Sequence, residues 1–196
     1  MFFVRLVAGL ALLIAAVMIG RGARAEVGEV FLGDPNAPVT IIEYASLTCP
    51  HCAAFHKETL PGLKARYIDT GKVKLSFRDF PLDENAVRAS MLAHCAGPER
   101  YYRFLDVFFA QQASWAGARD PVAALKQLAK LGGMSEEAAT TCLADRSIED
   151  AILRARLEGS EKHGVRSTPS FIIDGKLYAG NRTVDEFAEI IDPLLD

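Results

Sequence analysis

The 196-residue sequence has few cysteines, no excess of positive charge and no long apolar run, and each lack excludes a class of protein. Four cysteines are too few for a disulfide-rich scaffold, so a hydrophobic core must hold the fold together. With 22 basic and 25 acidic residues, the chain has a net charge of −3 and lacks the basic character expected of a nucleic-acid-binding protein. Internal repeats and low-complexity linkers are also missing, so the length suits one domain, with or without an insertion.

The longest apolar run lies at the N-terminus, where residues 6–19 read LVAGLALLIAAVMI. These 14 uncharged residues fall short of the ~18 expected of a membrane span, and an A-x-A pattern follows at residues 23–25. We therefore predict a secretory signal peptide over residues 1–25, cut before Glu26; a retained N-terminal anchor is the alternative. Cleavage would remove three arginines and leave 19 basic and 25 acidic residues, a net charge of −6.

The exported part opens with a strand–helix–strand pattern. Residues 38–46 (PVTIIEYAS) form a β-branched and aromatic run bounded by proline, which predicts a buried strand. Helix formers follow from Cys49, and Pro61 predicts a kink near Leu60. Residues 72–80 alternate between apolar and polar side chains, as a half-buried strand does. Together these elements predict a βαβ unit.

Residues 83–163 read as helical almost throughout. Asp120 and Pro121 are typical of the N-cap and first position of a helix, and Ser135 is typical of another N-cap. This block therefore predicts several helices in succession and no strand.

The last part of the chain returns to strand character. Residues 170–174 predict a strand, residues 175–176 a turn and residues 177–179 a second strand of a hairpin. Residues 183–195 predict an amphipathic helix. The order βαβ, helical block, ββα is better explained by one sheet with a helical insertion than by two consecutive domains.

The most informative motif is Cys49-Pro50-His51-Cys52, which follows the first predicted strand and begins a helix. Two thiols at this spacing can close into a small disulfide ring, and the N–H groups and dipole of a helix N-terminus stabilise a thiolate. A protonated His51 would add positive charge beside the sulfur. Because a stabilised thiolate favours the reduced pair, its disulfide is a stronger oxidant, and the motif predicts a disulfide donor.

The positions of the two thiols predict their roles. Cys49, nearer the helix end and expected to be more exposed, should be attacked by a substrate thiolate, and Cys52, one turn inside, should be the buried resolving thiol. An inert disulfide is one alternative, and a zinc site is another, although structural zinc usually needs a second close ligand pair. The other candidate ligands offer no such pair: His56, His94, Cys95 and His163.

Three segments carry a resemblance to a known family: IIEYASLTCPHC at residues 41–52, VRSTPSFIIDG at residues 165–175, and the helical block between them. In these segments the chain resembles the DsbA-like thiol:disulfide oxidoreductases of the thioredoxin superfamily, which act in the bacterial periplasm. Over about residues 27–196, the resemblance implies an α/β, thioredoxin-like fold with an inserted helical subdomain. The implied division is a thioredoxin-like domain over residues 26–82 and 164–196, and a helical insertion over residues 83–163.

The resemblance also implies roles for three residues outside the motif. Pro169 would follow a cis peptide bond and lie against the active-site disulfide, which would leave the backbone of Thr168 free to pair with a bound peptide. Glu43 would be a buried acid that moves protons for Cys52. From the residues alone, a glutamate on an edge strand that points to water is the alternative for Glu43.

Cys95 and Cys142 both fall in the predicted helical block. In an exported protein an even cysteine count favours a second, structural disulfide between them, and two separate buried thiols are the alternative. Such a bridge would stabilise the fold by about 4 kcal/mol at most in the chain-entropy model.

The predicted function is an oxidase that passes the Cys49–Cys52 disulfide to reduced exported polypeptides through a mixed disulfide. By resemblance, a quinone-linked membrane partner would reoxidise it; we expect a monomer that uses no cofactor, metal or nucleic acid. An isomerase or reductase with the same pair is one alternative, although isomerases of this superfamily usually carry a dimerisation module, for which residues 26–37 leave little room. A non-catalytic, chaperone-like peptide-binding module is the other.

Overall fold

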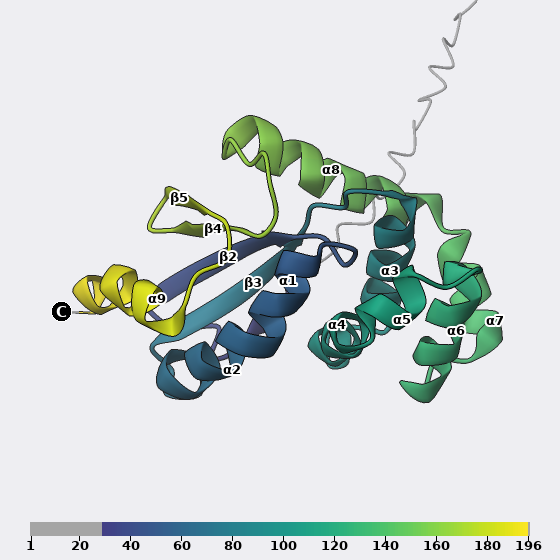
Figure 1. Cartoon of the computed structure of the whole chain (residues 1–196), viewed down its shortest axis with the longest axis horizontal. Coiled ribbons are helices and arrows are strands. Elements are labelled where there is room, and N and C mark those ends of the chain that lie inside the picture. The colour runs from purple at the N-terminus through teal and green to yellow at the C-terminus, as the bar shows by residue number, and fades with distance from the viewer. Residues whose placement is uncertain (1–28, 196) are drawn as a thin grey trace, which may run out of the picture.

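The computed structural model of the chain describes residues 29–195, so the predicted signal peptide lies outside the described residues. Within residues 29–195, no helix is both long and apolar enough to cross a membrane. Figure 1 shows the sheet in the middle, helices α3 to α7 gathered at one end of the molecule, and α9 at the other. The predicted combination of one sheet with many helices is confirmed.

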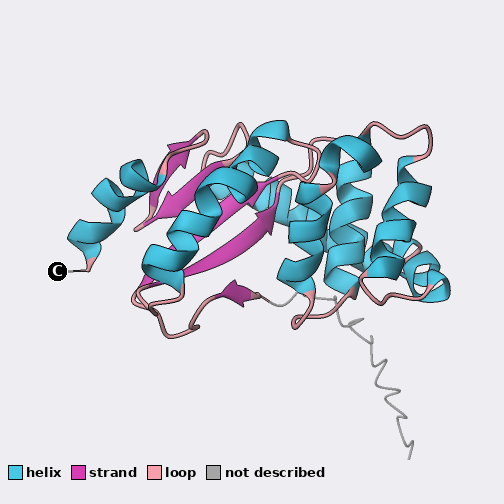
Figure 2. Ribbon diagram, turned by 60° about the horizontal axis from the view of Figure 1, so that its bottom comes forward, coloured by secondary structure: helices cyan, strands magenta, loops and turns pink. Residues whose placement is uncertain are grey.

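Five strands form one mixed sheet in the order β1-β3-β2-β4-β5. Only β2 and β3 run parallel, because the helical segment between them makes a crossover, and the other pairs are antiparallel (Figure 2). The central strand is therefore β2, which pairs with β3 on one side and β4 on the other. The strands are β1 (Phe31–Leu32), β2 (Val39–Ala45), β3 (Val73–Asp79), β4 (Ser170–Ile173) and β5 (Lys176–Ala179).

The helical segment between β2 and β3 alternates between α-helical and π-helical turns. Pro61 has no backbone N–H to donate, and the predicted irregularity near Leu60 falls where a π-helical turn gives way to an α-helical one. The pieces of this segment are α1 (Pro50–Ala54), η1 (Phe55–Thr59), α2 (Leu60–Leu63) and η2 (Lys64–Ile68).

The helical block and the C-terminal helix follow β3 and β5, respectively. The predicted caps are confirmed: the side chain of Asp120 accepts a hydrogen bond from the Ala123 amide, and that of Ser135 from the Ala138 amide. The helices are α3 (Glu84–Cys95), α4 (Tyr101–Ala110), α5 (Gln112–Ala116), α6 (Pro121–Leu131), α7 (Glu136–Leu143), α8 (Arg146–Lys162), α9 (Val184–Ile191) and the 3₁₀ turn η3 (Asp192–Leu194).

Strand β2 presents alternate side chains to two covered faces. Ile41 packs with Phe55 and the rest of the cluster under the β2–β3 helical segment and α9. Tyr44 points to the opposite face, where α8 approaches so closely that a Cβ at Gly159 would lie 2.6 Å from the tyrosine ring. Because side chains alternate along a strand, Glu43 shares the face of Ile41 and points toward the helix that carries the cysteine motif.

The helical block has a large apolar core of its own, which reaches the cysteine motif. Cys49 and Cys52 belong to the same cluster of buried residues as the core of the block. The largest fully buried members contributed by the block are Leu92, Leu105, Phe108 and Trp115. Burial of these side chains fixes the block against the end of the sheet where the motif lies.

One local prediction needs correction, and one short strand was missed. The two-residue strand β1 was not predicted, since two residues are too short to show an alternating pattern. The hairpin turn is formed by Asp174 and Gly175 rather than residues 175–176, and Lys176 already belongs to β5. Both turn residues have positive φ, 48° and 71°, which the Asp-Gly pair of a tight hairpin turn tolerates well.

Candidate active site

The Cys49-Pro50-His51-Cys52 motif lies where β2 leads into the first helix, as predicted. Cys49 is the N-cap residue of α1 in an extended conformation, and Pro50 occupies the first helical position. Cys52 is 0 % exposed, and Cys49 is also buried, at 4 %. The expected order of exposure is therefore right, but Cys49 is less accessible than predicted because the segment before β4 covers it.

The covering segment contains Thr168 and Pro169. Their peptide bond is cis, and the Sγ atom of Cys49 donates a hydrogen bond to the Thr168 carbonyl oxygen at 3.3 Å. Thr168 is 119 positions from Cys49 in the chain, so the fold itself brings the two residues together. The hydroxyl of Thr168 is buried and has no hydrogen-bond partner among residues 29–195.

The pKa of Cys49 is lowered to about 5. The hydrogen bond from the Cys52 side chain is the main cause, and burial opposes it. In the ionised form, the Thr168 hydroxyl and the backbone amides of Cys52 and His51 can donate further hydrogen bonds to the sulfur, which also lowers the pKa. While Cys49 is a thiol, it donates a hydrogen bond to the Thr168 carbonyl oxygen, and the Thr168 hydroxyl has no partner among the described residues. When Cys49 ionises, the hydroxyl can donate a hydrogen bond to the thiolate. At neutral pH the reduced protein therefore holds Cys49 as a thiolate.

The pKa of Cys52 is shifted the opposite way, far above its usual range. Burial is the main cause, followed by the hydrogen bond to Cys49 and the negative charge of Glu43. Cys52 thus stays protonated while Cys49 is ionised, and the two thiols have opposite protonation states at the same pH.

Glu43 lies below the cysteine pair and is 0 % exposed. It stands on the central strand of the sheet, so the alternative of a glutamate on an edge strand that points to water is wrong. Both of its carboxylate oxygens contact the Nε2 atom of His56, at 3.1 and 3.2 Å, and the His56 side chain is 4 % exposed. This buried pair was not predicted, although the spacing of four residues from Cys52 places His56 on the same face of the helical segment.

The middle residues of the motif lie outward. Pro50 and His51 are both exposed, in contrast to the two cysteines that flank them. The contact of His51 with the Cys49 sulfur runs through its backbone amide. Within residues 29–195, no group of three potential metal-ligating side chains comes together, at the motif or elsewhere.

Comparison with known proteins agrees with this geometry. A family model described as thioredoxin matches residues 25–193 of the chain. The crystal structure of alpha-DsbA1 from Wolbachia pipientis is 36% identical, with a TM-score of 0.79 over 86% of this chain and 91% of that one. The chain belongs to the thioredoxin family, in its DsbA-like group.

Two further similar proteins show how far the similarity extends. A Rickettsia typhi protein named as a protein-disulfide oxidoreductase is 32% identical over 170 residues, 86% of this chain. The chain spans only 62% of the length of that relative. BdbD from Bacillus subtilis is 23% identical with a TM-score of 0.77, over 85% of this chain and 92% of that one, and shares the fold.

In this DsbA-like chain the helical block also supports the motif directly. The buried side-chain amide of Gln112, on α5, donates hydrogen bonds to the carbonyl oxygens of Leu47 and Cys49, at 2.9 and 3.0 Å. Sequence reasoning missed Gln112, because no local pattern distinguishes it from the neighbouring, exposed Gln111. The two residues whose carbonyl groups it contacts, Leu47 and Cys49, are 65 and 63 positions away from Gln112 along the chain.

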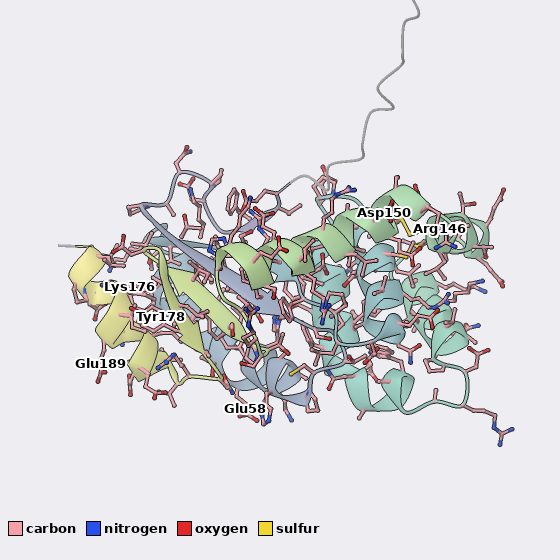
Figure 3. The ribbon with its side chains drawn as sticks, turned by 90° about the horizontal axis from the view of Figure 1, so that it is seen from above. Glu58, Arg146, Asp150, Lys176, Tyr178 and Glu189 are labelled. Carbon is pink, nitrogen blue, oxygen red and sulfur yellow. A yellow bond between two sulfur atoms is a disulfide. The ribbon has the colours of Figure 1, made fainter. Side chains whose placement is uncertain are left out.

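The second cysteine pair lies in the helical block. Cys95, the last residue of α3, and Cys142, near the end of α7, are joined by a disulfide. Figure 3 shows this bond near the Arg146 end of α8, across the molecule from the hairpin that carries Lys176 and Tyr178. The alternative of two separate thiols does not apply, and the bond is remote from the hairpin end of the sheet.

Proposed function

We propose that the chain is a thiol:disulfide oxidoreductase that donates its Cys49–Cys52 disulfide to exported polypeptides. The observation that carries the proposal is the opposite shift of the two cysteine pKa values beside the Thr168 carbonyl. A protein that stabilises the Cys49 thiolate also stabilises its own reduced form, and this makes the disulfide a good oxidant of other thiols. The names of the similar proteins agree with this chemistry.

In the first step, a substrate thiolate attacks the Sγ atom of Cys49. A new sulfur–sulfur bond forms, the bond between Cys49 and Cys52 breaks, and the electron pair moves to the Sγ atom of Cys52. That sulfur then takes up a proton, which its raised pKa favours. The buried carboxyl of Glu43, on the face below the pair, is placed to supply this proton.

In the second step, another thiolate of the substrate attacks the substrate sulfur of the mixed disulfide. Cys49 leaves as a thiolate, and its pKa of about 5 makes it a good leaving group. The substrate is oxidised by two electrons, and the protein pair is reduced.

The same arrangement supports a site for an extended peptide. Both edges of β4 are already paired, one with β2 and the other with β5, so a substrate would instead pair with the backbone at Thr168, just before the strand. We further propose that the protein acts as a monomer in the periplasm after loss of residues 1–25, and that a quinone-linked membrane partner reoxidises it. The thioredoxin-like domain would comprise residues 26–82 and 164–196, and the insertion residues 83–163.

Two single substitutions test the mechanism with a reduced peptide that contains two cysteines. Cys49→Ala is expected to abolish disulfide transfer, because it removes the attacked sulfur. Cys52→Ala has no internal disulfide, so it is mixed with a peptide whose cysteine is joined to glutathione in a mixed disulfide. The Cys49 thiolate should attack that bond, expel one thiolate and keep the other sulfur in a mixed disulfide, because Cys52 is absent and cannot release it; mass spectrometry detects the product. Transfer by the Cys49→Ala protein would refute the proposal.

A redox titration against glutathione separates the oxidase from the alternatives. An oxidase pair should equilibrate within the range of the glutathione couple, whereas a pair too reducing for glutathione to reduce would indicate an inert disulfide in a binding module. One structural neighbour, from Novosphingobium aromaticivorans, is titled a protein-disulfide isomerase and is 25% identical with a TM-score of 0.75. Strong refolding of a scrambled substrate would therefore favour the isomerase alternative.

A further inference from the structure

His56 is a buried ionisable residue of this site that has no role in the exchange steps described above. Its Nε2 atom faces both oxygens of Glu43, and its ring stacks on Phe109 with centroids 4.1 Å apart. The other ring nitrogen, Nδ1, is buried and has no hydrogen-bond partner among residues 29–195. A buried nitrogen without a partner is unusual in a folded protein and indicates a functional role or an ordered water. It also lies within the π-helical turn η1, a feature often found at functional sites.

The environment of His56 suggests where a proton on Nδ1 would go. Around the ring pack the apolar side chains of Phe55, Phe77 and Phe109. On α4, the carboxyl of Asp106 is exposed, and the nearby charge of His56 opposes the effect of burial on its pKa. His56 therefore contacts a fully buried carboxyl, that of Glu43, and is near enough to the exposed Asp106 to influence the pKa of that carboxyl.

The other ionisable groups near this path are few. The charge of Glu43 acts on Cys52 of α1 and on Tyr101 and Tyr102 of α4. Burial raises the pKa of both tyrosines, so that they stay protonated at neutral pH. Lys64 of η2 lies near Asp106. Strand β3 contributes an apolar ring at this position. The two tyrosines therefore do not give up protons at neutral pH, and Glu43, His56 and Asp106 are the described groups that remain along this path.

We propose that His56 is a positioning residue that relays protons between Glu43 and the protein surface at Asp106. The relay rests on the proposed function, because it concerns the proton that Cys52 gains when the disulfide opens. In that step Cys52 takes a proton from Glu43, Glu43 takes one from Nε2 of His56, and Nδ1 takes one from the Asp106 side through a water. When the disulfide closes again, the same proton moves outward.

Closure of the disulfide tests the relay without any polypeptide substrate. Oxidised glutathione added to the reduced protein forms a mixed disulfide on Cys49, and Cys52 must lose its proton before it attacks and releases glutathione. Acid quenching and mass spectrometry give the rate of this closure at several pH values. His56→Gln keeps an N–H donor for Glu43 but cannot carry a proton, so we expect closure to slow about tenfold or more. His56→Ala should be slowed similarly and be restored by added imidazole.

The chain offers a matched control. His94 also forms a buried pair with a carboxylate, since its Nε2 atom lies 2.6 Å from Asp79, and its ring also stacks on an aromatic side chain, Tyr101. His94→Gln should close its disulfide within about twofold of the unaltered rate, because this pair does not contact Glu43 or Cys52. The absorbance of the Cys49 thiolate should titrate unchanged in all of these variants.

Asp106→Asn is expected to have a smaller effect, about two- to fivefold, since water can replace an exposed carboxylate. The proposal would be overturned if the folded His56→Gln protein closed its Cys49–Cys52 disulfide at the unaltered rate at every pH. It would also be overturned if His56→Ala closed the disulfide slowly and added imidazole did not restore the rate. If both His56 variants fail to fold, the closure rate of the Asp106→Asn protein is the test, and an unaltered closure rate would overturn the relay. Failure of the unaltered protein to oxidise a reduced peptide would instead count against the proposed function, whatever the closure rates.

Discussion

The two cysteine pairs of this chain show how position in the fold separates a reactive pair from a structural one. Cys49 and Cys52 lie on one helical turn, so a bond between them restrains almost no chain. Cys95 and Cys142 lie on α3 and α7, 47 residues apart, and their bond ties two helices together. Opening the first pair leaves the packing of the fold in place, whereas opening the second would release a long loop in the unfolded chain.

The surroundings of the pairs differ as much as their spacing. The reactive pair lies at a helix N-terminus, beside the Thr168 carbonyl. The hydrogen bond from Cys52 is the main cause of the lowered pKa of Cys49, and burial is the main cause of the raised pKa of Cys52, to which Glu43 also contributes. Substitutions at the structural pair should therefore lower the stability of the fold, and substitutions at or beside the reactive pair should change its chemistry. Four experiments test this separation.

The largest expected effect on stability comes from the double substitution Cys95→Ser and Cys142→Ser. Loss of a bridge over 47 residues should lower the free energy of unfolding by up to about 4 kcal/mol. Disulfide transfer by Cys49 should persist below the new unfolding midpoint. Urea unfolding and a peptide-oxidation assay on the same samples measure both. Loss of transfer in a folded variant would show that the pairs are coupled.

Gln112→Ala is expected to have the next largest effect. It leaves the carbonyl oxygens of Leu47 and Cys49 without their shared donor, which should cost about 1–3 kcal/mol of stability. Gln111→Ala, at the exposed neighbouring position, is the matched control and should change stability by less than about 0.5 kcal/mol. Equal urea midpoints for the two variants would mean that the helical block does not support the motif through this amide.

The pH dependence of stability should distinguish the reduced protein from the oxidised one. The pKa of Cys49 is about 5 in the folded, reduced protein and about 8.5 in an unfolded chain, so folding favours the thiolate. Its contribution to stability is lost as the pH falls through about 5, and it grows as the pH rises toward about 8.5. The oxidised pair has no thiol to titrate.

Thermal unfolding at several pH values between these limits measures this contribution. The melting temperature of the reduced form, relative to that of the oxidised form, should rise with pH. A Cys49→Ser protein, which lacks the titrating thiol, should show no such rise. A flat difference in the unaltered protein would contradict the low pKa of Cys49.

The smallest expected effect is that of Thr168→Val, which keeps the backbone carbonyl and removes only the hydroxyl. The pKa of Cys49 should rise by a minor part of its total shift, since the Cys52 hydrogen bond is the larger cause. Thiolate absorbance against pH measures the change. Ser167→Ala, which removes an exposed neighbouring hydroxyl, is the control and should leave the titration unchanged.

Local patterns were enough to locate most of the fold. The β-branched run before Cys49 and the alternating residues of β3 predicted the central strands, and capping residues such as Asp120 predicted helix starts, because these signals act over a few residues. The strand β1 and the position of the hairpin turn escaped, since one is too short for a pattern and the other depends on which residues adopt positive φ.

By itself, the sequence determined that two thiols stand at the start of a helix, because their spacing and the strand before them are local features. Only the tertiary structure decided that the Thr168 carbonyl contacts the sulfur of Cys49. The same holds for the hydrogen bond from Gln112 to the Cys49 carbonyl and for the contact between His56 and Glu43. These contacts join residues from different strands and helices, some more than 100 positions apart. They exist only because burial of the two apolar faces of the sheet, and of the helical block beside it, brings those elements together.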